Sequence, residues 1–251
     1  MLSNVRGLLA LALVGAIALS GCGSSDDDVL VSAATSLKAA FTNYGEQFDA
    51  ANAQLSFAGS DELAAQIRSG AKPDVFAAAN TKLPDQLYKE GLVEQPKVFA
   101  TNRLVLAVPS DGTKVGSVED LKAPGVKLAI GAASVPIGSY TRKVLARLDP
   151  AERRGILANV RSNEPDVGGI SAKLTQGAVD AGFLYITDVQ ATNGRLRAIE
   201  LPAKLQPEVA YGVAIVTGGK NHPAAQDFVD GLLKGDGAAA LKAAGFEPPP
   251  T

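Results

Sequence analysis

Small and hydroxyl-bearing residues gather at four places where a short apolar run gives way to a helical pattern, at residues 34–37, 58–61, 135–139 and 166–169. Ser36 and Ser60 lie in the first two segments, and Gly138 and Gly168 lie in the other two. The N-terminus of a helix presents unpaired backbone N–H groups and the positive end of the helix dipole. Such a turn binds anions. The chemistry that these residues indicate is therefore the binding of a small anion through neutral donors.

Each of these residues also has a purely structural explanation. Ser36 and Ser60 are good N-cap residues, and capping its own helix is the commoner role of a serine in that place. The glycines suit tight turns. Tyr185 ends an apolar run, and a tyrosine there usually packs with its hydroxyl at a rim. The order of the segments along the chain is therefore more informative than any one of them.

Short apolar runs alternate with helical patterns from residue 29 onward. Strands are predicted at 29–33, 54–58, 75–78, 103–108, 126–130, 181–185, 196–200 and 211–216. Helices are predicted at 37–48, 62–69, 82–90, 139–148, 170–176, 224–233 and 237–244. This alternation predicts parallel sheets covered by helices. The ends of such strands share one edge of a sheet, so the four segments are expected to face one cleft.

The pattern restarts after Pro109, as if in a second unit. The predicted strands 103–108 and 211–216 could pair with each other. One of them would leave the first unit and the other would return to it, and together they would make a double crossover between two lobes.

The ordered set of segments resembles the molybdate-binding proteins of ABC transporters. The resemblance rests on VSAATSL at 31–37, FAGSDELAAQI at 57–67, KPDVF at 72–76, VPIG at 135–138, PDV at 165–167 and GFLY at 182–185. It implies a two-lobed α/β fold of the periplasmic-binding-protein type (type II-like). Each lobe would be a mostly parallel sheet flanked by helices, with two hinge strands between the lobes. Lobe one is expected at 29–103 and 208–251, and lobe two at 104–207.

The family holds a tetrahedral oxyanion between its lobes with neutral donors. By resemblance, Ser36 and Ser60 supply hydroxyls, Ile137 and Val167 supply backbone N–H groups, and Tyr185 supplies its phenolic O–H. An oxyanion has only acceptors, and each charge-assisted hydrogen bond to it is worth about 1.5–3 kcal/mol. The expected ligand is molybdate or tungstate. Molybdenum would be bound as the oxyanion, with no cofactor and no direct ligands to a metal ion.

Two residues depart from the pattern of the family. The family often has a small residue where Ile137 stands, so its side chain either narrows the cleft or points away from it. Asp61 follows Ser60 directly, and a carboxylate that faces a dianion repels it. Asp61 and Glu62 would favour a helix N-terminus from the solvent side. Alternatively, Asp61 accepts the proton of hydrogen phosphate, and the ligand is then phosphate.

The only cysteine, Cys22, stands behind Arg6 and an apolar run at residues 8–19. The segment Leu19-Ser20-Gly21-Cys22 resembles a bacterial lipoprotein signal. Residues 1–21 are therefore expected to be a removed signal peptide, Cys22 the lipidated residue, and residues 22–28 a flexible tether. The protein would then lie at the outer face of the cytoplasmic membrane. The alternatives are a buried free cysteine and a short transmembrane anchor, but the run is short of the roughly 20 residues that an anchor requires.

Composition narrows the classes of partner. Loss of Arg6 with the signal leaves 23 of the 24 Lys and Arg residues against 26 Asp and Glu, a balance that argues against nucleic acid. With one cysteine and one histidine, neither a disulfide nor a zinc or copper site is expected. The expected partners are the oxyanion, an ABC permease with its ATPase, and the membrane through the lipid anchor. The protein is expected to be a monomer.

An enzyme is the competing class, but its usual motifs are incomplete. A serine acyl-transferase needs Ser-x-x-Lys, whereas Lys38 follows Ser36 by two positions only. His222 lies in a turn and is expected at the surface. A binding protein for phosphate or sulfate is the nearer alternative, and discrimination against sulfate would have to rest on cavity size. A purely structural lipoprotein would not need several donor-rich helix starts.

Overall fold

The computed structural model describes residues 28–249 of the 251-residue chain. The predicted signal peptide (1–21) and lipidation site (Cys22) lie outside the described residues, as does the predicted tether except for Asp28. That residue already belongs to the first strand. None of the described helices has the length and apolar character needed to cross a bilayer.

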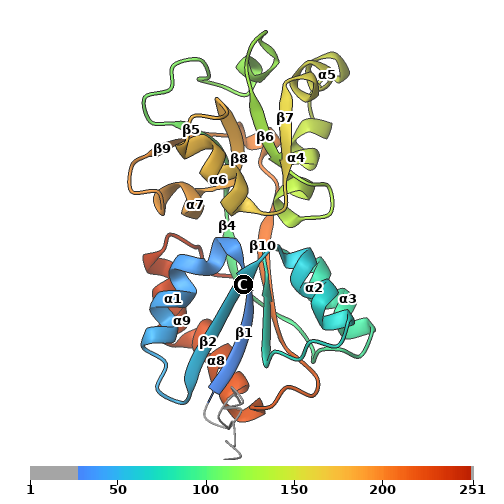
Figure 1. Ribbon diagram of the computed structural model, residues 1–251, viewed down its shortest axis with the longest axis vertical. Coiled ribbons are helices and arrows are strands. Elements are labelled where there is room, and N and C mark those ends of the chain that lie inside the picture. The colour runs from blue at the N-terminus through green and yellow to red at the C-terminus, as the bar shows by residue number, and fades with distance from the viewer. Residues whose placement is uncertain (1–27, 250–251) are drawn as a thin grey trace, which may run out of the picture.

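Two lobes lie one above the other along the long axis of the molecule, each built on a five-stranded sheet (Figure 1). The sheet of the first lobe has the order β2-β1-β3-β10-β4. Its strands, in that order, are Asn52–Ala58, Asp28–Ala34, Val75–Ala78, Val209–Ile215 and Lys97–Asn102. The sheet of the second lobe has the order β7-β6-β8-β5-β9. Its strands, in that order, are Val160–Glu164, Leu128–Gly131, Ala181–Tyr185, Leu104–Pro109 and Leu196–Glu200.

One strand in each sheet is antiparallel to the other four. In the first lobe β1 is parallel to β2 and β3, whereas β10 is antiparallel to β3 and β4. In the second lobe β6 is parallel to β7 and β8, whereas β5 is antiparallel to β8 and β9. The mostly parallel two-lobed α/β fold that the sequence predicts is therefore confirmed.

Helices cover both faces of each sheet. The helices of the first lobe are η1 (Thr35–Leu37), α1 (Lys38–Glu46), α2 (Ser60–Arg68), α3 (Lys82–Lys89), α8 (His222–Lys234) and α9 (Asp236–Ala243). Those of the second lobe are η2 (Glu119–Lys122), α4 (Pro136–Ala146), α5 (Pro150–Ala158), α6 (Val167–Thr175), α7 (Ile186–Gln190) and η3 (Ala203–Leu205). Figure 1 shows α1, α8 and α9 on one side of the first sheet and α2 and α3 on the other.

The fully buried strand β3 shows how the sequence produces this layering. Val75 and Ala77 pack into the core that includes α1 and α8, whereas Phe76 and Ala78 pack into the core under α2 and α3. Successive side chains of a strand point to opposite faces of its sheet. A strand with a core on each face must therefore be apolar at every position, and β3 reads Val-Phe-Ala-Ala.

The predicted pairing between strands 103–108 and 211–216 is wrong. These segments belong to different sheets, because β10 pairs with β3 and β4 whereas β5 pairs with β8 and β9. The strand β4, which the sequence analysis does not identify, takes the place beside β10. The elements α5, β7 and α7 are also absent from the prediction. Strand β7 reads Val-Arg-Ser-Asn-Glu, and such a polar edge strand carries no apolar run.

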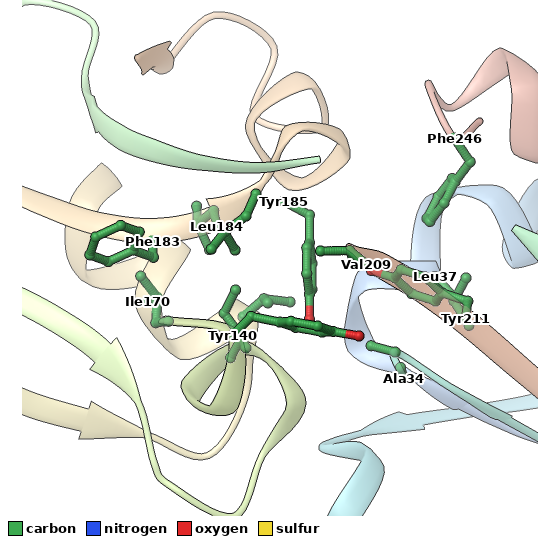
Figure 2. Close-up of a cluster of buried hydrophobic side chains, with 14 of the residues drawn as sticks. Ala34, Leu37, Tyr140, Ile170, Phe183, Leu184, Tyr185, Val209, Tyr211 and Phe246 are labelled. Carbon is green, nitrogen blue, oxygen red and sulfur yellow. The ribbon is translucent and has the colours of Figure 1, made fainter. Parts of the chain in front are cut away.

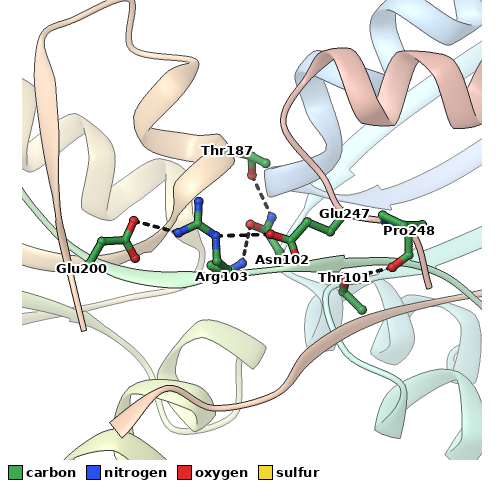
Figure 3. Close-up of polar contacts among 7 residues, drawn as sticks. All are labelled: Thr101, Asn102, Arg103, Thr187, Glu200, Glu247 and Pro248. Atoms are coloured by element: carbon green, nitrogen blue, oxygen red, sulfur yellow. Dashed lines mark hydrogen bonds and ion pairs between the residues drawn. The ribbon is translucent and has the colours of Figure 1, made fainter. Parts of the chain in front are cut away.

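The chain passes from the first lobe to the second through Arg103, between β4 and β5 (Figure 3). Asn102 is buried at this crossing and donates from Nδ2 to Thr187 Oγ1 of the second lobe at 2.9 Å. The Arg103 guanidinium contacts Glu200 at 2.8 Å and Glu247 at 3.3 Å. The backbones of Thr101 and Glu247 exchange two hydrogen bonds of 2.8 and 3.0 Å. The C-terminal segment therefore contacts the chain at the crossing, next to strand β4 of the first lobe.

Candidate ligand site

One small cavity at the junction of the lobes is lined by all the residues that the sequence analysis selects as ligand donors. Its wall comprises Ala34, Thr35, Ser36, Ala58, Gly59, Ser60, Ala79, Val135, Pro136, Ile137, Pro165, Asp166, Val167 and Tyr185. The cavity measures about 20 Å³, close to the roughly 10–15 Å³ that one water molecule needs. Sites for drug-sized ligands measure roughly 300–1,000 Å³. The cavity therefore has room for little more than one water molecule, and a groove of about 670 Å³ that shares Thr35, Ser36 and Val167 with its wall lies beside it.

The two serines of the first lobe are buried, and each hydroxyl lies within hydrogen-bond distance of one protein donor. Ser60 Oγ accepts from the backbone N–H of Ala79 at 3.1 Å. Ser36 Oγ lies 3.0 Å from the Tyr211 hydroxyl, and either oxygen is able to donate. A hydroxyl that accepts from the protein keeps its own hydrogen for another acceptor. Both serines are thus suited to donate into the cavity.

Neither serine caps its helix, so the structural explanation offered for them is wrong. The N-caps are Ala34 before η1 and Gly59 before α2, and neither makes a side-chain cap bond. Ser36 and Ser60 lie inside the first helical turn instead. The hydroxyls are consequently not used to satisfy the N–H groups at the start of their own helices.

The first turn of α4 packs closely against the end of β6, and this contact fixes the position of the Ile137 backbone. A Cβ on Gly138 would overlap the carbonyl oxygen of Ala132, so only glycine fits there. Arg142 donates from Nη1 to the carbonyl oxygens of Gly131 and Gly138 at 2.9 and 3.0 Å. The helix has no side-chain cap, and Pro136 stands in its first turn. The N–H groups of that turn have no partner within the helix.

The Ile137 side chain packs against Gly131, where a Cβ would lie only 2.6 Å from Ile137 Cγ2. Its bulk is therefore accommodated by a glycine at the strand end. Val167 is the first residue of α6 and is 6% exposed. For both residues the side chain is buried in the second lobe, which leaves the backbone as the group available to a ligand.

Tyr185 closes the cavity from the end of β8. Its side chain is fully buried, and its hydroxyl has no hydrogen-bond partner in the structure. Figure 2 shows the Tyr140 side chain reaching from the second lobe toward Ala34 of the first, with Tyr185 beside Tyr140. The rings of Tyr185 and Tyr211 lie 5.7 Å apart between centroids. Burial raises the pKa of the Tyr185 phenol well above its ordinary value, so the group remains a neutral donor.

Asp166 is a residue of the wall to which the sequence analysis assigns no separate role. It caps α6 by accepting from the Gly169 N–H at 3.0 Å, and it accepts from Thr35 Oγ1 at 2.8 Å. An Asp at the start of a predicted helix is an N-cap signal that the sequence does contain. The contact with Thr35 spans 131 positions of the chain, and no local pattern reveals it.

Three further carboxylates stand close in the chain to residues of the cavity wall without lining the cavity. Asp61 and Glu62 stand in the first turn of α2, the position that favours its N-terminus. Asp188, in α7, accepts from the Tyr185 N–H at 3.1 Å. Burial, opposed by that N–H and aided by the charge of Asp166, raises the pKa of Asp188 from 3.8 to about 7. Among residues 28–249, no three His, Cys, Asp or Glu side chains come together as a site for a metal ion.

Residues 29–247 match the family described as bacterial extracellular solute-binding protein. The chain is 33% identical over 262 residues to the molybdate-binding protein ModA of Mycobacterium tuberculosis, with 96% of this chain and 98% of that protein covered. The chain belongs to the bacterial extracellular solute-binding protein family. Its location is therefore extracytoplasmic, and its family is not one of enzymes.

Two other proteins extend the comparison. This solute-binding protein is 28% identical over 237 residues to ModA of Escherichia coli, which covers 89% of this chain and 90% of that protein. The periplasmic molybdate-binding protein of Azotobacter vinelandii superposes with a TM-score of 0.79 at 21% identity, covering 88% of this chain and all of that one (100%). That likeness supports the two-lobed fold. The resemblance on which the sequence analysis relies is confirmed.

Proposed function

We propose that this solute-binding protein captures molybdate, and also tungstate, between its lobes and delivers it to an ABC import permease. The observation that carries the proposal is the buried, unpartnered Tyr185 hydroxyl at the wall of a cavity lined by Ser36, Ser60 and two helix starts. Leaving a buried donor unsatisfied costs about 1–3 kcal/mol. An oxyanion in the cavity removes that cost. The relatives named for molybdate binding supply the choice of anion.

The donors proposed to hold the ligand are Ser36, Ser60, Ile137, Val167 and Tyr185. The hydroxyls and amides are neutral, so the charge of the anion is balanced by dipoles rather than by a cation. Phosphate is less well supported, because Asp61, its proposed proton acceptor, does not line the cavity. Sulfate is the second candidate ligand, since it carries the same charge and shape at a smaller size.

We assign residues 29–103 and 208–251 to lobe one and residues 104–207 to lobe two, of which residues 250 and 251 lie outside the described residues. The strand ends at Asn102 and Leu104 and the start of β10 at Val209 support these boundaries. The lobes are proposed to close on the anion by hinge motion near residues 103 and 208. The protein is proposed to act as a monomer, without catalysis.

Cys22 is proposed to carry the lipid anchor after removal of residues 1–21, which keeps the protein at the outer face of the cytoplasmic membrane beside its permease. One acyl chain binds a membrane only marginally, so stable retention requires more than one. Mass spectrometry of the membrane fraction tests this directly. A modified N-terminal Cys22 is expected, and an unmodified N-terminus elsewhere would contradict the assignment.

A thermal-shift screen with molybdate, tungstate, sulfate and phosphate tests the proposed ligand. A ligand that binds only the folded state raises stability by mass action, by about 2.7 kcal/mol at a hundredfold excess over its Kd. Molybdate and tungstate are expected to raise the melting temperature strongly, and phosphate is expected to leave it unchanged. Indifference to every oxyanion would exclude the proposed function, and a shift with sulfate alone would select the second candidate.

A further inference from the structure

Thr35 and Asp166 join the two lobes at the cavity wall. Thr35 Oγ1 donates to Asp166 Oδ2 at 2.8 Å, and both residues line the cavity. Thr35 belongs to η1 of the first lobe, and Asp166 is the N-cap of α6 in the second. Each residue stands directly before a proposed donor, Thr35 before Ser36 and Asp166 before Val167. The hydrogen bond therefore ties together the two halves of the donor set.

Two glycines let the lobes approach closely around this bond. A Cβ on Gly168 would lie 3.3 Å from Thr35 Cγ2. A Cβ on Gly59 of the first lobe would lie 2.7 Å from the carbonyl oxygen of Pro165 of the second. The helix α6 also packs against η1 at this junction. The bond between Thr35 and Asp166 thus exists in an arrangement in which the lobes are closed on the cavity.

Asp166 places a carboxylate beside a site proposed for a dianion, and both of its oxygens are engaged. Oδ1 accepts from the Gly169 N–H at 3.0 Å, and Oδ2 accepts from the Thr35 hydroxyl. Hydrogen bonds to a carboxylate are stronger than those between neutral groups and stabilise its charge. Loss of the Thr35 hydroxyl would leave Oδ2 without this donor at the wall of the anion site, where repulsion of the ligand would increase.

We propose that the Thr35–Asp166 hydrogen bond is a latch that holds the lobes closed on the ligand and positions Ser36 and Val167 around it. The proposal rests on the proposed function, because the latch matters only when an anion occupies the cavity. Thr35 and Asp166 are positioning residues, since they bind each other rather than the ligand. The latch must break before the lobes part, so its main effect is on the rate of ligand release.

Thr35→Val tests the latch because valine keeps the shape of threonine without the hydroxyl. Calorimetry with molybdate is expected to show affinity reduced by about tenfold or more. Release of radiolabelled molybdate is expected to account for the loss through faster dissociation. Thr35→Ser, which restores the hydroxyl, is expected to bind nearly as the wild type does. Thr42→Val is the matched control, because Thr42 is exposed on α1 and lies outside the cavity.

A double-mutant cycle separates the latch from a general structural effect. Asp166→Ala removes the partner of Thr35 together with the cap of α6. In the Asp166→Ala background, Thr35→Val is expected to change neither affinity nor release rate further, because the bond is already absent. The free energy of unfolding of the ligand-free protein, measured for each variant, reports the loss of the cap separately.

Three results would overturn the inference. Unchanged affinity and release in Thr35→Val, with molybdate binding intact in the wild type, would overturn the latch and leave the proposed function standing. If the double variant lost affinity by the product of the fold-losses of the two single variants, the two residues would not act through their mutual bond. Failure of the wild type to bind molybdate, tungstate, sulfate or phosphate would overturn the proposed function and the latch with it.

Discussion

Tyr185 carries a phenolic hydroxyl that is fully buried and has no partner in the protein. Its neighbours Tyr140 and Tyr211 lie 6.3 and 5.7 Å away between ring centroids. Burial raises the pKa of Tyr211 as well as that of Tyr185, so neither phenol carries a charge that would repel an anion. At the scale of single residues, Tyr185 is thus a buried neutral donor beside Tyr211 that makes no hydrogen bond of good geometry within the described protein and is available to a ligand.

Tyr185→Phe separates this use from a role in folding. Removing a buried donor that has no protein partner should cost no stability, so the free energy of unfolding of the ligand-free protein is expected to stay the same or rise by about 1 kcal/mol. Molybdate affinity is expected to fall by about tenfold or more, since a charge-assisted hydrogen bond is lost. Chemical denaturation and calorimetry measure the two quantities.

Tyr88→Phe is the matched control for that substitution, because Tyr88 is 48% exposed on α3. It is expected to change neither quantity. A Tyr185→Phe variant that loses stability but binds molybdate as the wild type does would show that the hydroxyl serves the fold instead of the ligand.

Asp188 makes stability depend on pH. Burial raises its pKa from 3.8 to about 7 in the folded protein, so the folded state binds more protons than the unfolded state between these values. The contribution of Asp188 to stability is therefore most favourable at low pH and is lost as the pH rises toward about 7. Asp188→Asn is expected to be more stable relative to the wild type at pH 8 than at pH 5.

Chemical denaturation at the two pH values measures this difference. Asp111→Asn is the control, since Asp111 is exposed and its replacement is expected to leave the pH dependence as it is in the wild type. Parallel pH profiles for the wild type and Asp188→Asn would contradict the assignment of the raised pKa to Asp188.

Helix starts are the elements that form the site, and the sequence predicts most of them. The segments at 58–61, 135–139 and 166–169 contain the observed starts of α2, α4 and α6. Glycine and hydroxyl residues identify such turns locally, because they follow from backbone geometry. All five residues selected by resemblance line one cavity. Their roles toward a ligand remain a proposal.

Long-range features of the elements are not predictable from the same patterns. Strand β10 is recognisable as an apolar run, but its partners β3 and β4 depend on which strand lies beside it. Ser36 contacts Tyr211 across 175 positions, and Thr35 contacts Asp166 across 131. Neither contact has a sequence spacing that indicates it. These contacts follow from the packing of the two lobes.

Gly138→Ala tests the importance of the contact between α4 and β6. The added Cβ would overlap the carbonyl oxygen of Ala132, so the first turn of α4 must move. Overpacking of this kind costs about 1–3 kcal/mol, and molybdate affinity is expected to fall because the N–H of Ile137 moves with the turn. Gly116→Ala is the control, since the nearest atom to its Cβ lies 3.6 Å away. Unchanged stability and affinity in Gly138→Ala would contradict this account of the helix start.

The whole molecule brings its donors together only when both lobes meet. The first lobe contributes Ser36 and Ser60, and the second contributes Ile137, Val167 and Tyr185. The lobes are joined covalently at Arg103 and just before Val209, and the ion pairs of Arg103 are exposed and individually weak. A ligand between the lobes therefore stabilises their closed arrangement, as expected for hinge closure.

Anomalous diffraction from crystals grown with molybdate tests the central claim most directly, because it locates molybdenum without reference to the protein atoms. One strong peak per chain is expected in the cavity between the lobes. The anion oxygens should lie within hydrogen-bond distance of the Ser36, Ser60 and Tyr185 hydroxyls and of the Ile137 and Val167 N–H groups. A peak elsewhere, or an empty cavity at saturating molybdate, would contradict the account.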